Sequence, residues 1–290
     1  MLYNNNMDFY DERQTIIKEV KPQRIWEIDF LRGFCILFML WDHLMFCLST
    51  EYFGYEWFRV TESEFLMSII NGADIYLESA IRVMFHPFFV VMFFLLCGIS
   101  CSFSRSNLKR GLQLFVISWV VTIVTTLINM PIKFGVLHML SCAILVYWLI
   151  NTLCKKDKIK TAVTCLTVGL FIIILGEWFL HFNGMYDGFY QNDNLAFLSK
   201  SFATRYYVSY DYFPLLPNVG YVLIGGASAT LLYNKKRSLL PILDKYGWYK
   251  PIAWWGKIAL WVYLLHQVIF SAIFAIISFL FITPGNFIVF

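Results

Sequence analysis

Seven long apolar runs constrain this chain more than any other feature of its sequence. Each run has about 18 residues or more, the length that a helix needs to cross roughly 30 Å of hydrocarbon. Lipid offers no partners to backbone polar groups, so the runs must form helices or a closed barrel, and barrel strands are shorter and alternate in polarity. We therefore expect an all-α, polytopic integral membrane helix bundle with about seven transmembrane helices. The runs are Phe30–Thr50, Val83–Phe103, Leu112–Asn129, Phe134–Leu153, Thr161–His181, Phe213–Tyr233 and Ile258–Ile282.

The composition agrees with lipid as the solvent of this chain. Of its 290 residues, 59% are hydrophobic and only 14% are charged, whereas a soluble domain has roughly 25% charged residues. The formal net charge of +4 is too small to indicate a nucleic-acid partner. The seven cysteines show no C-x-x-C spacing or other metal-ligand pattern, so we expect no metal and interpret them as packing residues or free thiols.

The basic residues between the runs predict which end of the bundle faces the cytoplasm. With the N-terminus inside, the inner segments 1–32, 104–111, 154–160 and 234–257 hold 18 of the 23 Lys and Arg residues. Inner loops of membrane proteins carry such an excess. We therefore expect the N-terminus in the cytoplasm and the C-terminus outside. The apolar segment Phe65–Ile70 is too short to span, so we expect it to lie at the interface.

The first run carries polar side chains that a membrane helix would have to bury. At 3.6 residues per turn, Asp29, Arg32 and His43 share one helix face. Asp29 and Arg32 are spaced for an i,i+3 ion pair at the cytoplasmic mouth, and His43 lies roughly 16 Å deeper than Arg32. Because ionisable groups inside a span are costly, we favour a functional role for this face. The alternative is that Arg32 extends to lipid phosphates and His43 is a packed, hydrogen-bonding residue.

Further polar residues lie in or beside the other runs. Asp42 is about 100° around the helix from His43, so it need not be the partner of that imidazole. His266 and Gln267 are two polar groups within the last run, where a functional role and an interhelical hydrogen bond explain them equally well. Three candidates lie toward the outer side, where cavity-lining and structural roles both stay open: His86 beside Pro87 at the start of the second run, His138 early in the fourth, and Asp211 just before the sixth.

A compact basic cluster follows the second run, at Arg105, Lys109 and Arg110. Such a cluster can bind the phosphates of a cytosolic cofactor, although topology alone would also place basic residues there. The chain has no P-loop, no G-x-G-x-x-G dinucleotide fingerprint, no G-x-S-x-G elbow and no H-E-x-x-H motif, so those enzyme classes lose support.

Five short motifs occur in one order along the chain. The first is Arg24–Gly33 with a histidine ten residues later, and the second is Gly98–Ser100 followed by the basic cluster. The others are Phe134–His138, Asp211–Pro217 leading to Gly225, and Tyr263–Gln267. In this order, from about residue 24 to residue 270, they resemble the heparan-α-glucosaminide N-acetyltransferase catalytic-domain family, part of a wider group of transmembrane acyltransferases.

The resemblance implies that an acyl group is taken from cytosolic acyl-CoA and passed through the membrane core to an acceptor, usually a sugar. It also implies an imidazole that acts as a base or as a transient acyl carrier. Animal members carry a catalytic histidine in the loop after the first span, whereas residues 51–82 here contain no histidine. They also have an Asn where this chain has His43. We therefore take His43 as the catalytic imidazole and His86 as the second candidate.

These observations predict a single transmembrane acyltransferase domain over residues 24–290, after a cytoplasmic leader at 1–23. The expected reaction moves an acetyl or other acyl group from acetyl-CoA or another acyl-CoA to a carbohydrate acceptor outside. Asp29 and Arg32 would organise the cytoplasmic mouth, and the basic cluster would meet the CoA phosphates. The residues expected to line the substrate cavity are Asp42, His138, Asp211, His266 and Gln267.

The expected surroundings are those of an integral protein of a bacterial cytoplasmic membrane. Its partners would be the lipid bilayer, an acyl-CoA and a carbohydrate acceptor, without nucleic acid, and a homodimer is left open. The alternative function is a non-enzymatic transporter or lipid flippase that uses the buried charges as a proton relay. The sequence shows no internal repeat, and because many secondary transporters are built from repeats, this favours the enzyme.

Overall fold

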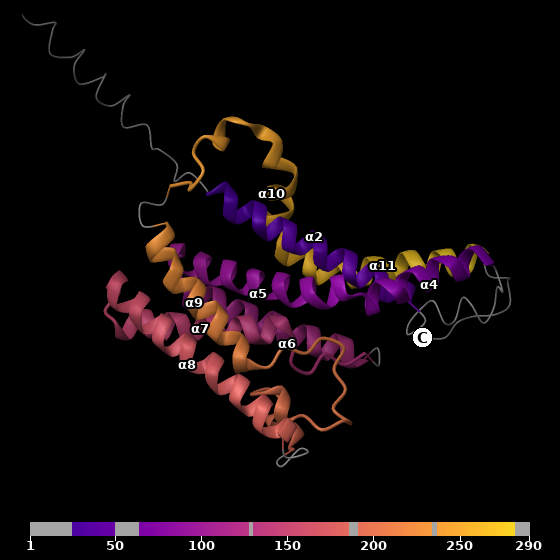
Figure 1. The fold of residues 1–290 in the computed structure, drawn as a ribbon, viewed down its shortest axis with the longest axis horizontal. Coiled ribbons are helices and arrows are strands. Elements are labelled where there is room, and N and C mark those ends of the chain that lie inside the picture. Colours follow the sequence, from indigo (N-terminus) through magenta and orange to yellow (C-terminus); the bar gives the residue numbers. More distant parts are fainter. Residues whose placement is uncertain (1–24, 50–63, 128–129, 186–190, 234–236, 282–290) are drawn as a thin grey trace, which may run out of the picture.

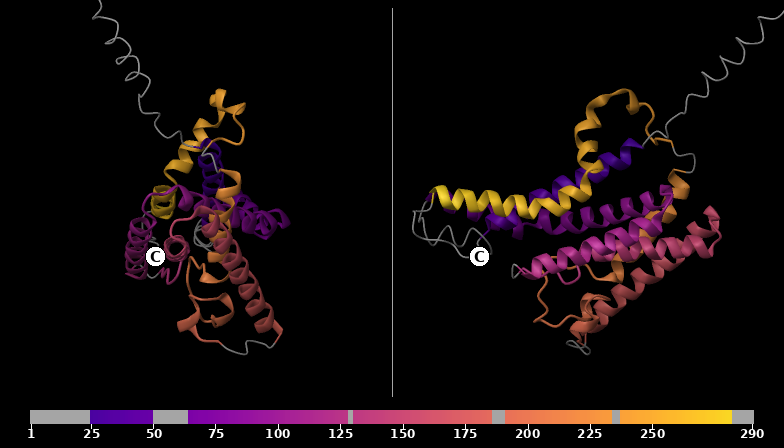
Figure 2. Two further views of the ribbon diagram at one scale, coloured as in Figure 1. Left: turned by 90° about the vertical axis from the view of Figure 1, so that its left-hand side faces the viewer. Right: turned by 180° about the vertical axis from the view of Figure 1, so that it is seen from behind.

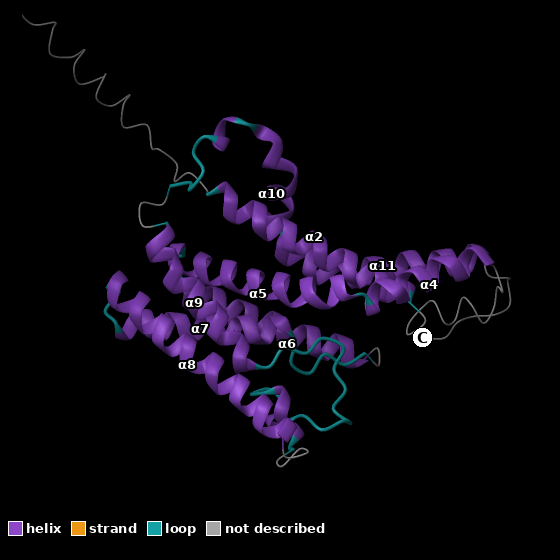
Figure 3. Ribbon diagram, viewed as in Figure 1, coloured by secondary structure: helices purple, strands orange, loops and turns teal. Residues whose placement is uncertain are grey.

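The computed structural model is a helical bundle that describes residues 25–49, 64–127, 130–185, 191–233 and 237–281 (Figure 1). These residues form helices and loops without a strand (Figure 3), and seven of the helices are long and apolar enough to cross a membrane. The predicted all-α bundle with seven spans is therefore confirmed. The seven are α2 (Trp26–Leu48), α5 (Ala80–Phe103), α6 (Asn107–Leu127), α7 (Val136–Leu153), α8 (Lys158–Met185), α9 (Leu215–Leu232) and α11 (Ala259–Phe281).

Most of the spans begin before the apolar run that predicts them, because polar residues supply the first turn. Ser79 accepts a hydrogen bond from the Arg82 amide and thereby caps α5, which begins at Ala80. His86 and Pro87 thus lie more than a turn inside α5, and the expectation that they open the second span is wrong. The predicted ends Thr50, Asn129 and Ile282, together with the leader at 1–23, lie outside the described residues.

Two shorter helices mark the two ends of the bundle (Figures 1 and 2). At the α10 end lie α10 (Lys250–Lys257), the turn between α5 and α6, and the turn between α7 and α8. At the α4 end lie α4 (Glu64–Glu78), which packs against α2 and α5, and the loop that precedes α9. The basic segments 104–111 and 154–160 share the α10 end, but which end faces the cytoplasm stays a prediction. α4 contains Phe65–Ile70, and its expected position at the interface also stays a prediction.

Glycines hold two helix pairs in backbone contact. A Cβ atom at Gly98 of α5 would collide with the carbonyl oxygen of Val222 in α9, and one at Gly225 of α9 would collide with that of Leu95. α2 and α10 meet in the same way, since Gly256 faces the carbonyl oxygen of Asp29. Small residues allow this close packing in lipid, where van der Waals contact drives helix association.

The core lies between α5, α7 and α9. Its fully buried side chains include Phe94, Met139 and Leu223, one from each helix. All seven cysteines are free thiols, as expected, and four of them are buried. Because α5, α7 and α9 fill this core, the polar residues of α2 and α11 are left to face cavities on one flank of it.

Candidate functional site

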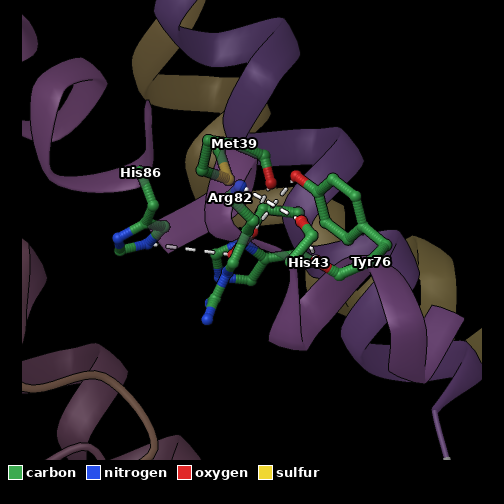
Figure 4. A network of polar contacts seen from close by, with 7 residues as sticks. Met39, His43, Tyr76, Arg82 and His86 are labelled. Carbon is green, nitrogen blue, oxygen red and sulfur yellow. Dashed lines mark hydrogen bonds and ion pairs between the residues drawn. The ribbon is translucent and has the colours of Figure 1, made fainter. Parts of the chain in front are cut away.

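Asp42 of α2 is buried near the α4 end and contacts three polar side chains. Figure 4 shows these three partners, Tyr76, Arg82 and His86. Arg82 of α5 donates to both carboxylate oxygens, at 2.9 Å from Nε and 3.2 Å from Nη2. The hydroxyl of Tyr76 in α4 donates at 3.4 Å, and Nε2 of His86 lies 3.8 Å from Oδ2. Asp42 thus joins α2, α4 and α5, and these contacts use neither His43 nor any other residue of its own helix.

His43 and His266 face each other across α2 and α11. Their ring centroids are 4.7 Å apart and the rings are nearly perpendicular, at 87°. His43 Nδ1 lies 2.9 Å from the carbonyl oxygen of Met39, and His266 Nδ1 lies 2.7 Å from that of Tyr263. A carbonyl oxygen only accepts hydrogen bonds, so Nδ1 of each ring carries a proton. In the neutral form of the ring, Nε2 then holds a lone pair. His266 Nε2 is buried and has no hydrogen-bond partner among the described residues.

Asp211 lies beside this imidazole pair, in the loop before α9. Its Oδ2 accepts a hydrogen bond from the Tyr263 hydroxyl at 2.5 Å and another from the Val136 amide at 2.9 Å. The Val136 contact caps α7, and Gly135 leaves room for the carboxylate because a Cβ there would collide with it. Burial raises the pKa of the Asp211 carboxyl, while the hydrogen bonds from Tyr263 and Val136 act in the opposite direction.

Two cavities surround these side chains. The central pocket, of about 90 Å³, is lined by Asp42, His43, His86, Asp211 and Tyr263, among others. The larger α4-end cavity, of about 520 Å³, is also lined by Asp42, His43, Asp211 and Tyr263. Arg82, His266 and Gln267 reach only this second cavity. The structure therefore brings together six residues that the sequence singled out separately: Asp42, His43, His86, Asp211, His266 and Gln267.

A third cavity, of about 900 Å³, opens at the α10 end. Arg32, Arg110 and Lys257 line it, and the rest of its wall is largely apolar. Arg32 makes the predicted ion pair with Asp29 at 3.2 Å and donates to the Ser100 hydroxyl at 2.6 Å. The Arg32 guanidinium is thereby fixed at the cavity wall.

Tyr263 lines all three cavities, so they adjoin at its side chain. Val136 and Phe93 also line both the α10-end cavity and the central pocket. A row of cavities therefore leads from the cations of the α10 end to the imidazole pair. Arg32 lies at one end of this row of cavities and His43 at the other. The sequence predicted that they share one face of the first span, but not that separate cavities hold them.

His138 lies apart from these cavities, at the start of α7. The Gly135 amide donates to His138 Nδ1 at 3.3 Å, so the proton is on Nε2, which donates to the Thr122 hydroxyl at 3.2 Å. The ring packs against Trp119 and Phe134. Both ring nitrogens are thus engaged, Nδ1 at the N-cap of α7 and Nε2 in a contact with α6, and no cavity that holds the imidazole pair includes His138.

The basic cluster is not a single surface. Arg105, Lys109 and Arg110 are all exposed, but only Arg110 lines the α10-end cavity. Lys109 and Arg110 are successive residues of α6, so their side chains point about 100° apart. Arg105 lies in the turn before the helix.

Sequence reasoning overlooked three residues of the site: Arg82, Tyr263 and Lys257. Arg82 and Lys257 had been counted only as loop charges that set the orientation. The signal for Arg82 was its place one turn before His86, on the same helix face. Tyr263 stands in a noted motif, three residues before His266, and the same argument could have found it. Within the described residues, no group of three or more His, Cys, Asp and Glu could hold a metal ion.

Residues 57–268 match the family described as Heparan-alpha-glucosaminide N-acetyltransferase, catalytic. The chain belongs to this family. No curated protein and no solved structure matches it. The family indicates a membrane acetyltransferase, and the seven apolar helices make the chain an integral membrane protein.

The match includes most of the cavity-lining residues and excludes α2. His86, Arg110, Asp211, Tyr263 and His266 lie within residues 57–268. α2, which carries Asp29, Arg32, Asp42 and His43, precedes the matched region. The geometry nevertheless places three of these residues against matched helices, with Arg32 and Asp42 on α5 and His43 on α11. The carbonyl oxygen of Asp29 faces Gly256 of α10, which also lies within the matched region.

Proposed function

We propose that this protein transfers an acetyl group from acetyl-CoA, bound at the α10 end, to a carbohydrate acceptor at the α4 end. The observation that carries the proposal is the row of cavities that meet at Tyr263, with cations at one end and two imidazoles at the other. With the α10 end in the cytoplasm, the donor would bind inside and the acceptor outside. A bacterial cytoplasmic membrane fits this arrangement.

The α10-end cavity fits an acyl-CoA in charge and volume. Arg32, Arg110 and Lys257 can hold phosphates at its mouth. Its apolar inner wall, which includes Phe93 and Leu140, can accept the less polar pantetheine arm. Ligand sites commonly have volumes of roughly 300–1,000 Å³, and this cavity has about 900 Å³. The thioester would reach the central pocket beside Tyr263.

In the proposed reaction, His43 acts as the general base. Its Nε2 lone pair accepts the proton of an acceptor hydroxyl or amine as the oxygen or nitrogen attacks the thioester carbon. A new C–O or C–N bond forms, the C–S bond breaks, and the departing thiolate takes up the proton. His266 confines the ring of His43 from one side, and Arg82 balances the charge of Asp42.

Radiolabelled acetyl-CoA tests the proposal on purified protein in lipid nanodiscs, with and without candidate sugars. Transfer of label to a sugar together with release of CoA supports it. Release of CoA without a labelled product indicates that the true acceptor is missing from the panel. If the protein neither releases CoA nor transfers label, the enzymatic function is contradicted, whether or not acetyl-CoA binds. The transporter then becomes the favoured function. Label retained on the denatured protein would make His43 an acyl carrier instead of a base.

A further inference from the structure

The row of cavities has one wall made by α6 and another made by α11. Each helix packs mainly on another partner, α6 against α7 and α11 against α2. Leu112 and Val116 of α6, with Leu260 of α11, line the α10-end cavity. A crevice therefore runs between these two spans, and it continues along the α4-end cavity.

Facing apolar stripes form the rims of this crevice. On α6 the stripe repeats every four residues, and so does the stripe on α11, which places each set along one helix face. Side chains on both rims are exposed, with Val124 at 52% and Val268 at 66%. From Leu112 to Val124 the α6 stripe is roughly 18 Å long, more than half the thickness of the hydrocarbon. The stripes are Leu112, Val116, Val120 and Val124 on α6, and Leu260, Leu264 and Val268 on α11.

Polar groups lie directly behind the rims at the α4 end. His266, Gln267 and Ser271 belong to the same turns of α11 as Leu264 and Val268, and Thr125 follows Val124 on α6. Polar groups that face lipid hydrocarbon are costly, so a crevice with this lining suits an amphiphile. Its head would meet the polar groups, and its chains would lie between the apolar rims.

We propose that the acceptor is a membrane lipid that carries a sugar, and that it reaches the imidazole pair sideways, between α6 and α11. This inference rests on the proposed function and names the acceptor class. The sugar would occupy the α4-end cavity beside His43, His266 and Gln267, while the lipid chains stay between Val124 and Val268. A water-soluble sugar has no apolar chain that could lie between the rims of a crevice open to the hydrocarbon.

The first test locates the lipid without relying on catalysis. A glycosyl diacylglycerol with a diazirine in its acyl chain is photo-cross-linked to the protein in nanodiscs, and the labelled peptides are mapped. We expect label on residues 112–127 and 260–271, reduced by excess unlabelled glycolipid but not by the methyl glycoside of the same sugar. Label spread evenly over the outward faces, α8 included, would overturn the proposal. So would label in the crevice that is displaced by long-chain acyl-CoA alone, because the crevice would then hold the donor's chain.

The second test blocks the crevice. Val124→Trp and Val268→Trp narrow it from opposite walls, and Ile174→Trp on α8, where the native side chain is 67% exposed, is the matched control. Each sugar is offered both as a glycolipid and as a methyl glycoside. We expect the glycolipid to be the better acceptor by tenfold or more. We also expect both blocking variants to lose tenfold or more of that transfer while they bind acetyl-CoA normally, and the control to keep it.

Two results separate this inference from the proposed function. In the first, the methyl glycoside is acetylated as fast as the glycolipid, with no loss in either blocking variant. That result would support the proposed function and contradict the lipid acceptor. If neither form of any sugar is acetylated and no CoA is released, the proposed function fails, and the cross-linking map alone decides whether the crevice binds lipid. A blocking variant that is not monodisperse is replaced by its counterpart on the opposite wall.

Discussion

At the scale of single residues, the position of the ring proton distinguishes three of the five histidines of this protein. In His43 and His266 a carbonyl of the same helix holds the Nδ1 proton, so Nε2 is left as a base. In His138 the proton is on Nε2 and both nitrogens are engaged. The hydrogen bonds thus leave His43 and His266 with a nitrogen that can act as a base, whereas His138 holds two helices together.

His43 is the residue whose loss should matter most for catalysis. Removal of a general base typically lowers the rate by about 10²–10⁴, so we expect that loss in His43→Ala, with acetyl-CoA binding unchanged. His86→Ala is the comparison, because His86 contacts the Asp42 network while lining the same pocket. Rates measured with radiolabelled acetyl-CoA decide between them. Normal transfer by His43→Ala, with loss in His86→Ala, would move the base to α5.

Substitution of Arg110 should affect acetyl-CoA binding more than substitution of Arg105 in the same basic cluster. It lines the α10-end cavity and Arg105 does not, and a hydrogen bond to a charged group is worth about 1.5–3 kcal/mol. We therefore expect Arg110→Ala to weaken acetyl-CoA binding about tenfold or more, and Arg105→Ala to leave it unchanged. Isothermal titration with purified protein measures both. An equal effect of the two substitutions would show that the cluster acts through its overall charge.

Many of the residues of the site could be predicted from the sequence, but the contacts between them could not. Asp42, His43 and His266 stand out because polar groups are rare in apolar runs and costly there. Asp211 stands out because it comes just before one of these runs. That His43 meets His266 depends on how α2 and α11 cross, and no local pattern encodes that crossing. Asp42 illustrates the limit, since the helical angle indicated that His43 need not be its partner but did not reveal Arg82.

At the scale of helices, the spans were predictable from apolar length, while their packing depends on particular glycines. Hydropathy finds each run because a helix of fixed rise must cross a fixed thickness. It places helix starts too late wherever polar residues form the first turn, as at Ala80 and Asn107. The close contact of α5 with α9 comes from Gly98 and Gly225, which hydropathy treats as ordinary residues.

The contact between α5 and α9 can be tested with two glycine substitutions. In Gly98→Ala the new methyl group would meet the Val222 carbonyl, so the helices must move apart, and overpacking of this kind costs about 1–3 kcal/mol. Gly72 of α4 has open space around it, so Gly72→Ala should gain up to about 1 kcal/mol from helix propensity. Thermal unfolding in detergent should therefore shift down for the first and not for the second. A shift in the same direction for both would contradict the packing argument.

At the scale of the whole molecule, the distribution of charge predicts that the α10 end of the bundle faces the cytoplasm. The basic segments 104–111 and 154–160 lie at the α10 end, and inner loops are rich in Lys and Arg. Single cysteines are introduced into a variant whose seven native cysteines are replaced. An impermeant maleimide added outside should label residues 191–210 and spare 155–160 and 240–250. Labelling of 240–250 from outside would reverse the donor and acceptor sides proposed above.

The glycine contacts also bear on how the protein would respond to the thickness of its bilayer. Helices in backbone contact, such as α5 with α9 and α2 with α10, have little freedom to change their mutual tilt. A membrane that is too thick or too thin is accommodated by tilt where packing permits it. α6 and α11 are each held mainly from one side, so mismatch should act first on these two helices. Lipid chain length would thereby adjust the width of the crevice between them.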